Sequence, residues 1–176
     1  MSGVKGGRPE PVQVIKQRRD AALAALVGRV PYFRFLGIEF DRRGDELTAV
    51  LPFQEKLIGN PLIPALHGGV IAGFLEAGAI VGLAWSQIWD EVESKSFDPD
   101  ALQGQGMPRL PKTIDFTIDY LRAGLPRDAY ARARITRAGR RYASVQVEAW
   151  QDNRDRPFAQ GMGRFLMPRV LDDKDD

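Results

Sequence analysis

The chain has 176 residues, with 25 lysines and arginines against 23 acidic residues and a formal charge of +2. This length suits one domain, and 44% hydrophobic residues are enough for a sizeable core. The near balance of charge argues against a nucleic-acid partner, for which a one-sided basic surface is typical. With no cysteine and one histidine, the chain lacks the side chains for a cysteine nucleophile or a multi-histidine zinc site, and we expect no metal.

The first residues point to a loose start and then one helix. Residues 1–9 are rich in glycine and charge, and we expect them to be disordered. Over residues 10–29, apolar side chains from Ile15 to Leu26 follow helical spacing and Gly28 supplies a stop, which predicts an amphipathic helix. The basic residues of this region are not followed by the continuous apolar stretch of a secretory signal, so we expect a cytoplasmic location.

A hairpin is predicted directly after this helix. Residues 36–51 alternate apolar and polar side chains around Gly44, which is typical of two strands, at 36–42 and 46–51, joined by a tight turn. A proline-rich loop follows at residues 59–66 and leads to the next element.

The segment from residue 68 to residue 88 is predicted to be a buried helix. Its only polar side chains are Glu76, Ser86 and Gln87, and a helix that is apolar on all sides belongs in a core. Residues 68–85 are long enough to span a membrane. However, the repeated glycines, the central Glu76 and the lack of close basic anchors argue against a membrane partner. The glycines and alanines are suited to the close approach of another backbone.

The remainder of the chain changes character twice. Residues 86–110 are polar and rich in glycine and proline; their start either continues the helix or leaves it, and the rest is expected to form a loop or lid. Short alternating runs joined by tight turns then predict an antiparallel meander, with strands at 113–121, 129–139, 141–150 and 157–167. Residues 169–176 are an acidic tail. The predicted fold is α+β, an antiparallel sheet of about six strands wrapped around one long buried helix, with an extra N-terminal helix.

The stretch HGGVIAGFLEAG, residues 67–78, resembles a motif of the hotdog-fold acyl-CoA thioesterases, in which an acidic residue follows the histidine by nine positions. TIDFTIDYLRAG, RITRAGRRYASVQVEAW and PFAQGMGRFLM are similar to the later strands of the phenylacetate-pathway-like and 4-hydroxybenzoyl-CoA thioesterase-like branch. The resemblance covers roughly residues 33–168. It implies a single hotdog domain over residues 10–168 and hydrolysis of an acyl-CoA or aroyl-CoA. Coenzyme A would then be part of the substrate rather than a separate cofactor.

The spacing within this motif has a geometric consequence. Nine residues of helix span about 13 Å, so the Gly68 amide and the Glu76 carboxylate of one chain cannot reach the same carbonyl group. If both act on one thioester, they come from different chains. Two such helices packed antiparallel about a two-fold axis would place Gly68 of one opposite Glu76 of the other. We therefore expect a homodimer, and the resemblance also allows a dimer of dimers.

Two residues of the motif have chemistry suited to acyl transfer. The Gly68 amide lies at a helix N-terminus, where it can stabilise negative charge on a carbonyl oxygen, although a Gly-Gly pair can also simply begin a tightly packed helix. Glu76 can act as a general base on water or attack the acyl carbon itself. The alternative is a carboxylate that reaches solvent or pairs with an arginine. The resemblance places Thr113 where relatives carry a serine or threonine that holds the water or the acid.

Further site residues are candidates with ordinary alternatives. The resemblance gives His67 a supporting role in shaping the loop, and a lone histidine is otherwise most often structural. Asn60 precedes His67 by seven positions where relatives carry Asn or Gln six positions before, so it either reaches the site or forms a turn before Pro61. A final group carries positive charge suited to the phosphates of coenzyme A, or is merely solvated surface: Arg122, Arg137, Gly139, Arg140 and Arg141.

Two other functions fit the same residues. A hotdog enoyl-thioester hydratase or dehydratase pairs a histidine with a carboxylate, as His67 and Glu76 could. A non-catalytic acyl-CoA binding protein would need the pocket without the chemistry.

Overall fold

The computed structural model describes residues 9–94, 96–98 and 109–168. The expected disordered start and the acidic tail fall almost entirely outside these residues, as does much of the predicted loop at 86–110.

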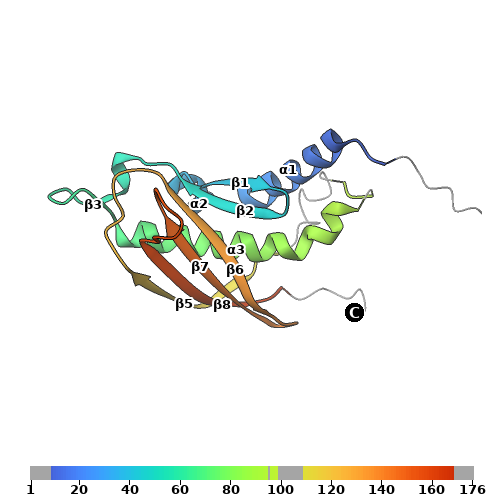
Figure 1. The fold of residues 1–176 in the computed structure, drawn as a ribbon. Coiled ribbons are helices and arrows are strands. Elements are labelled where there is room, and N and C mark those ends of the chain that lie inside the picture. The colour runs from blue at the N-terminus through green and yellow to red at the C-terminus, as the bar shows by residue number, and fades with distance from the viewer. Residues whose placement is uncertain (1–8, 95, 99–108, 169–176) are drawn as a thin grey trace, which may run out of the picture.

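One long helix, α3 (Gly68–Glu93), lies along a six-stranded sheet (Figure 1). The strand order is β1-β2-β6-β7-β8-β5, and each neighbouring pair is antiparallel. The architecture predicted from the sequence is thereby confirmed. The six strands are β1 (Glu39–Arg43), β2 (Glu46–Leu51), β5 (Lys112–Tyr120), β6 (Ala129–Ala138), β7 (Tyr142–Trp150) and β8 (Ala159–Leu166).

The core lies between α3 and the concave face of the sheet. Phe74, Leu75 and Val81 of the helix are fully buried, as are Val145 and Val147 of β7. By length and composition alone α3 could also cross a membrane, but 56% of its most apolar window is buried inside the protein. Because the sheet and the N-terminal helices cover much of α3, this core explains its apolar character.

Two helices precede the sheet, and the second of them was not predicted from the sequence. The first, α1 (Val12–Gly28), is close to the expected helix. The second, α2 (Pro31–Leu36), was not predicted, and its last residue, Leu36, had been assigned to the start of the first strand; that strand begins at Glu39 instead. Local caps decide the outcome, because proline is favoured in the first turn of a helix and Gly37, with φ of 74°, ends it in the left-handed conformation.

α3 is longer than the predicted helix and continues to Glu93. The first eight residues of the 86–110 segment are therefore helical. The added turns pack against α1, where the buried Arg18 side chain donates from Nε to the Val92 carbonyl (2.7 Å). This long-range contact stabilises the helical conformation of the polar residues at the end of α3.

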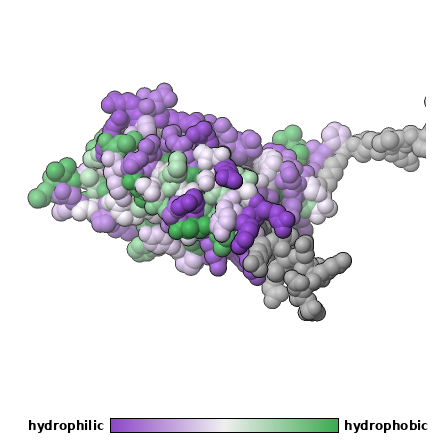
Figure 2. Space-filling model, turned by 90° about the horizontal axis from the view of Figure 1, so that it is seen from below, coloured by the Kyte–Doolittle hydropathy of each residue, from purple (hydrophilic) through white to green (hydrophobic). Residues whose placement is uncertain are grey.

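A small second sheet leads the chain into α3. It pairs β3 (Ile58–Asn60) with β4 (Ala65–Leu66), after a single 3-10 turn at Glu55–Leu57. The loop between the two strands exposes Leu62 and Ile63, which are 91% and 66% accessible. Figure 2 shows hydrophobic side chains at this end of the molecule, where Figure 1 places β3.

Candidate active site

The turn that begins α3 leaves one backbone amide without an acceptor. His67 is the N-cap, and its Nδ1 accepts a hydrogen bond from the Gly69 amide (2.9 Å). The amides of Val70 and Ile71 donate to the His67 carbonyl, and the His67 amide donates to the Leu57 carbonyl at the end of the 3-10 turn. Among the described residues, the Gly68 amide alone of this turn has no acceptor. It is available to a ligand at the positive end of a long helix.

Close packing holds the His67 turn in place. A Cβ atom added at Gly59 would lie 2.6 Å from the His67 Cα, so the β3 backbone must be bare at that point. On the other side the Tyr120 hydroxyl donates to the Gly68 carbonyl (2.9 Å). Tyr120 was not identified from the sequence; its only signal was its place as the last residue of the alternating strand.

Glu76 lies two turns further along α3 and is half-buried. The Thr113 hydroxyl donates to its Oε1 at 2.6 Å. The structure therefore brings these two predicted residues together, across 37 positions of sequence. A carboxylate that accepts one hydrogen bond keeps its second oxygen for a water molecule or a substrate.

Both contacts to α3 come from the same strand, β5. Thr113 lies near its start and Tyr120 at its end, so β5 contacts the two polar points of the helix. β5 is also an edge strand that pairs only with β8 within the described chain. Its side chains Ile114 and Tyr120 are 52% and 53% exposed. A single chain thus leaves this edge and the adjacent face of α3 uncovered.

Asn60 is occupied in its own loop. Its Oδ1 accepts from the amides of Leu62 (3.0 Å) and Ile63 (3.4 Å), the pattern of an Asx turn. The turn alternative is thus what the structure shows. No hydrogen bond joins Asn60 to His67 or Glu76 in the described chain. The same residues contain no group of three or more His, Asp or Glu side chains that could hold a metal ion.

The arginines of the β6–β7 hairpin surround a hollow of about 530 Å³. Arg164 of β8 joins them, which the sequence reading missed; its side chain pairs with Asp115 at 2.5 Å, and this hydrogen bond and charge raise the pKa of Arg164. Arg122 does not line the hollow, because it follows the opposite end of β5. The lining residues are Ile114, Arg137, Gly139, Arg140, Arg141, Tyr142, Ser144 and Arg164.

Comparison with known proteins gives consistent matches. Residues 64–158, more than half of the chain, match the model of the family described as the thioesterase superfamily. Proteins named medium/long-chain acyl-CoA thioesterase YigI from Escherichia coli K12 and Salmonella typhimurium are 35% and 34% identical over 125 residues, which is 70% of this chain and 77% of each relative.

Solved structures show the same fold. A Chromobacterium violaceum protein is 34% identical with a TM-score of 0.59, over 90% of this chain and 99% of its own. A Shewanella oneidensis protein related to the thioesterase superfamily has a TM-score of 0.65 at 23% identity, over 88% and 98%. A Bacillus halodurans protein crystallised with CoA has a TM-score of 0.58 at 20% identity, over 94% and 99%.

The family match and the relatives together show that this chain belongs to the thioesterase superfamily. The family predicted from the HGG motif and the later strands is therefore confirmed.

Proposed function

We propose that the protein hydrolyses the thioester of an acyl-CoA to a free acid and CoA, with medium- or long-chain acyl groups as the substrate class. The observation that carries this proposal is that one helix bears both a backbone amide without an acceptor, at Gly68, and a carboxylate that is held by the Thr113 hydroxyl, at Glu76. The names of the relatives at about 35% identity support the substrate class. A cytoplasmic location and the absence of a separate cofactor stay predictions.

In the proposed reaction Glu76 acts as general base. Its carboxylate takes a proton from a water molecule, whose oxygen attacks the thioester carbon, and the carbonyl oxygen gains a negative charge. The Gly68 amide of the partner subunit donates to that oxygen. The intermediate then expels the CoA sulfur, which takes up the proton held by Glu76. Attack by Glu76 itself would instead leave an anhydride, which rapid-quench mass spectrometry of the protein would detect as an acyl adduct.

The exposed edge of β5 supports a homodimer with shared sites. Two β5 strands related by a two-fold axis pair antiparallel, which sets the Thr113 end of one against the Tyr120 end of the other. Glu76 of one chain would then face the Gly68 turn of its partner. The same pairing brings Arg122 of one chain toward the arginine hollow of the other. A dimer of dimers would leave these sites intact.

The arginine hollow is the proposed site for the phosphates of CoA. Arg137, Arg140 and Arg141 supply three guanidinium groups on one hairpin, and guanidinium groups bind phosphate oxygens in bidentate geometry. Arg164 is partly neutralised by Asp115, so we assign it a weaker role.

Proline at position 68 provides a clean test of the oxyanion donor. Gly68→Pro removes the amide hydrogen, while proline is accepted at the first position of a helix and the extended His67 backbone (ψ of 134°) suits a following proline. Release of CoA thiol should fall by about 10²–10³-fold. Gly68→Ala is the matched control, since the nearest atom to an added Cβ is the Tyr120 hydroxyl oxygen at 3.4 Å, an ordinary van der Waals contact; the variant should stay near wild-type activity.

Mixed dimers test whether the site is shared. Glu76→Gln should lower thiol release by about 10²–10⁴-fold as a homodimer. Co-expression of Glu76→Gln with Gly68→Pro should restore about one quarter of wild-type activity, because half of the dimers contain one intact site. No recovery in isolated heterodimers would contradict the shared site. Hydration of an enoyl-CoA without thiol release would favour a hydratase, and saturable binding without turnover a binding protein.

A further inference from the structure

A groove of about 600 Å³ lies on another face of α3. Gly78 and Gly82 form part of its lining, and these positions lie about 120–160° around the helix from Glu76. Neither Glu76, Gly68 nor Thr113 lines the groove. It is therefore separate from the proposed catalytic site, and nothing in the reaction above uses it.

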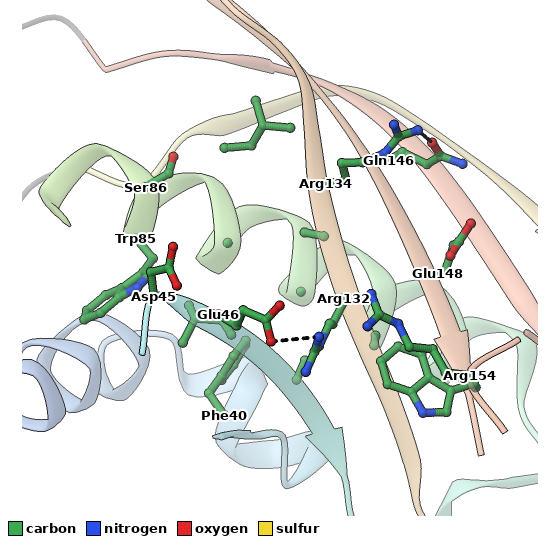
Figure 3. A pocket seen from close by; sticks show the side chains of 18 of the residues that line it. Phe40, Asp45, Glu46, Trp85, Ser86, Arg132, Arg134, Gln146, Glu148 and Arg154 are labelled. Atoms are coloured by element: carbon green, nitrogen blue, oxygen red, sulfur yellow. Dashed lines mark hydrogen bonds and ion pairs between the residues drawn. The ribbon is translucent and has the colours of Figure 1, made fainter. Parts of the chain in front are cut away.

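The groove exists because two strands of the sheet separate. β2 and β6 pair at only three positions, which end at Ala49 and Ala131. Beyond that point β2 continues only with β1, and β6 only with β7. The Arg132 side chain crosses the gap, donating to Thr48 Oγ1 (2.9 Å) and pairing with Glu46 (3.0 Å) (Figure 3). Through this gap the side of α3 is reached from outside.

Part of the groove lining is apolar and made of small side chains. Five lining residues are glycine or alanine, at Gly78, Gly82, Ala49, Ala131 and Ala133, and the larger Leu47 and Ile135 also line the groove. The small side chains leave room for an unbranched chain, and the volume is within the range of roughly 300–1,000 Å³ typical of small-molecule sites.

Aromatic side chains form the walls. All three tryptophans of the chain, Trp85, Trp89 and Trp150, line the groove together with Phe40. Trp85 is 3% exposed, and its indole N–H has no hydrogen-bond partner in the described part of the chain. Buried donors are normally paired, so the Trp85 indole N–H is available to donate to a ligand or to an ordered water molecule.

One end of the groove offers a free cation. Arg134 donates to Gln146 (2.6 Å), whereas Arg154 lies over the Trp150 ring, 5.5 Å from its centroid. Among the described residues Arg154 has no carboxylate within ion-pair distance, although Glu148 lines the same end (Figure 3). Arg154 would attract the carboxylate head group of a ligand at this end, and Glu148 would repel it.

We propose that this groove is a second ligand site, which binds the unbranched alkyl chain of a medium- or long-chain fatty acid with its carboxylate at Arg154. The other end is less suited to an anion, because Asp45 lies there beside Trp85 (Figure 3). The same chain could come from a free fatty acid or from the acyl group of a CoA thioester. The body of α3 separates the groove from Glu76, which favours the free acid, the product class of the proposed reaction.

Tryptophan fluorescence reports directly on this site. Titration of the full-length protein with dodecanoate, kept below its micelle concentration, should change the emission in a saturable way with one site per chain. Acetate has the same head without the chain and should cause no change. A linear, unsaturable change with dodecanoate would overturn the proposal.

Variants locate the chain and the head. Ser86 lines the groove on the exposed side of α3, and Ser86→Phe should weaken dodecanoate binding at least tenfold. Gln87→Phe changes the next residue, exposed and outside the groove, and should bind as wild type. Arg154→Gln should weaken dodecanoate binding by about threefold or more and Glu148→Gln should strengthen it, while both leave dodecan-1-ol unchanged. Equal effects of Ser86→Phe and Gln87→Phe would overturn the proposal.

Further measurements show whether the alkyl chain in the groove comes from a free fatty acid or from the substrate, and whether a second copy of the protein occupies the groove instead. A Ser86→Phe protein with an unchanged KM for dodecanoyl-CoA identifies free fatty acid as the ligand, and a raised KM identifies the acyl chain of the substrate; both outcomes support an alkyl site. A changed solution mass of Ser86→Phe with unaltered dodecanoate binding would make the groove a contact between copies and overturn the proposal. Thiol release from short-chain acyl-CoA tests the catalytic proposal independently, since Ser86→Phe should not alter it.

Discussion

The two halves of α3 are held in different ways. The first half carries the Gly68 amide and the Glu76 carboxylate. β5 donates one hydrogen bond to the Gly68 carbonyl, from Tyr120, and one to Glu76, from Thr113. The second half, towards Glu93, is covered by α1 and held by the side chains of Arg18 and Arg19. The first half is left partly open within one chain. At the C-terminal end of the second half, α1 closes the face that bears Val92 and Glu93, whereas the face that bears Gly82 and Ser86 stays open at the groove.

This difference separates rate from stability. Polar groups of the first half have few partners of their own, so they remain available to a substrate and to a second chain. At the C-terminal end of the helix, the Val92 carbonyl and the Glu93 carboxylate are bound by Arg18 and Arg19 of α1, so these arginines have a structural role. Changes in the first half should therefore alter turnover with little effect on folding, and changes in the second half should do the reverse.

Arg18→Met should produce the largest effect on stability. Arg18 is 7% exposed, donates to the Val92 carbonyl and pairs with Glu10 at 2.6 Å. Methionine would leave a buried carbonyl and a half-buried carboxylate without a donor, which should lower the free energy of unfolding by about 2 kcal/mol. Urea denaturation measures this loss. Lys16→Met, at an exposed position of the same helix, should change stability little; an equal loss there would contradict a specific role for Arg18.

Thr113→Val should lower kcat about tenfold, since a hydrogen bond to a charged group contributes about 1.5–3 kcal/mol. Thr113 is exposed in the chain, so its unfolding midpoint should barely move. Thr113→Ser retains the hydroxyl and should recover most of the rate. A serine variant as slow as the valine variant would show that the methyl group, rather than the hydrogen bond, positions Glu76.

Tyr120→Phe should have a smaller effect, a decrease in kcat of about threefold. The lost hydrogen bond is to the Gly68 carbonyl, on the same residue as the proposed oxyanion donor, and such a bond contributes about 0.5–1.5 kcal/mol. KM should stay constant. Tyr142, 52% exposed against 53% for Tyr120, lines the arginine hollow. Tyr142→Phe should leave kcat unchanged, and a similar fall in kcat for both tyrosines would argue against a specific contact to Gly68.

The sequence was sufficient for the features that repeat along the chain or lie within one motif. Alternation predicted the strands of the meander, and a long, mainly apolar stretch predicted a buried helix. Thr113 could be paired with Glu76 only through family resemblance, because 37 residues separate them. Each of these signals is carried by side-chain type, which the sequence states directly.

The remaining features depend on contacts between distant segments. The short helix at Pro31–Leu36 lies directly before an alternating stretch and is marked only by its caps, Pro31 and Gly37. The continuation of α3 to Glu93 depends on α1 folding against it. Tyr120 and Arg164 acquire their partners through the register of β5, and the groove depends on where β2 leaves β6. Apart from the caps of α2, none of these features has a local sequence signal.

The smallest expected effect is a pH-dependent one at the closed end of α3. Two hydrogen bonds from Arg19 to Glu93, both 2.6 Å, lower the pKa of the Glu93 carboxyl. Because the pKa is lower in the folded state, the pair stabilises the protein above the unfolded-state value of about 4.3–4.5. That stabilisation is lost as pH falls through the folded-state pKa. Both side chains are partly exposed and screened by solvent, so the pair should contribute only about 0.5 kcal/mol to the free energy of unfolding.

Glu93→Gln measures this term and completes the contrast between the two halves of the helix. At about pH 7 the variant should be less stable than the wild type by that small amount, and the difference should disappear as the pH falls through the lowered pKa of the folded-state Glu93 carboxyl. Added salt should shrink the difference at neutral pH, because exposed charges are screened. Thiol release should be unchanged throughout. A variant with normal stability but altered kcat would show that the closed half of α3 contributes to catalysis, and would break the division between rate and stability proposed for this helix.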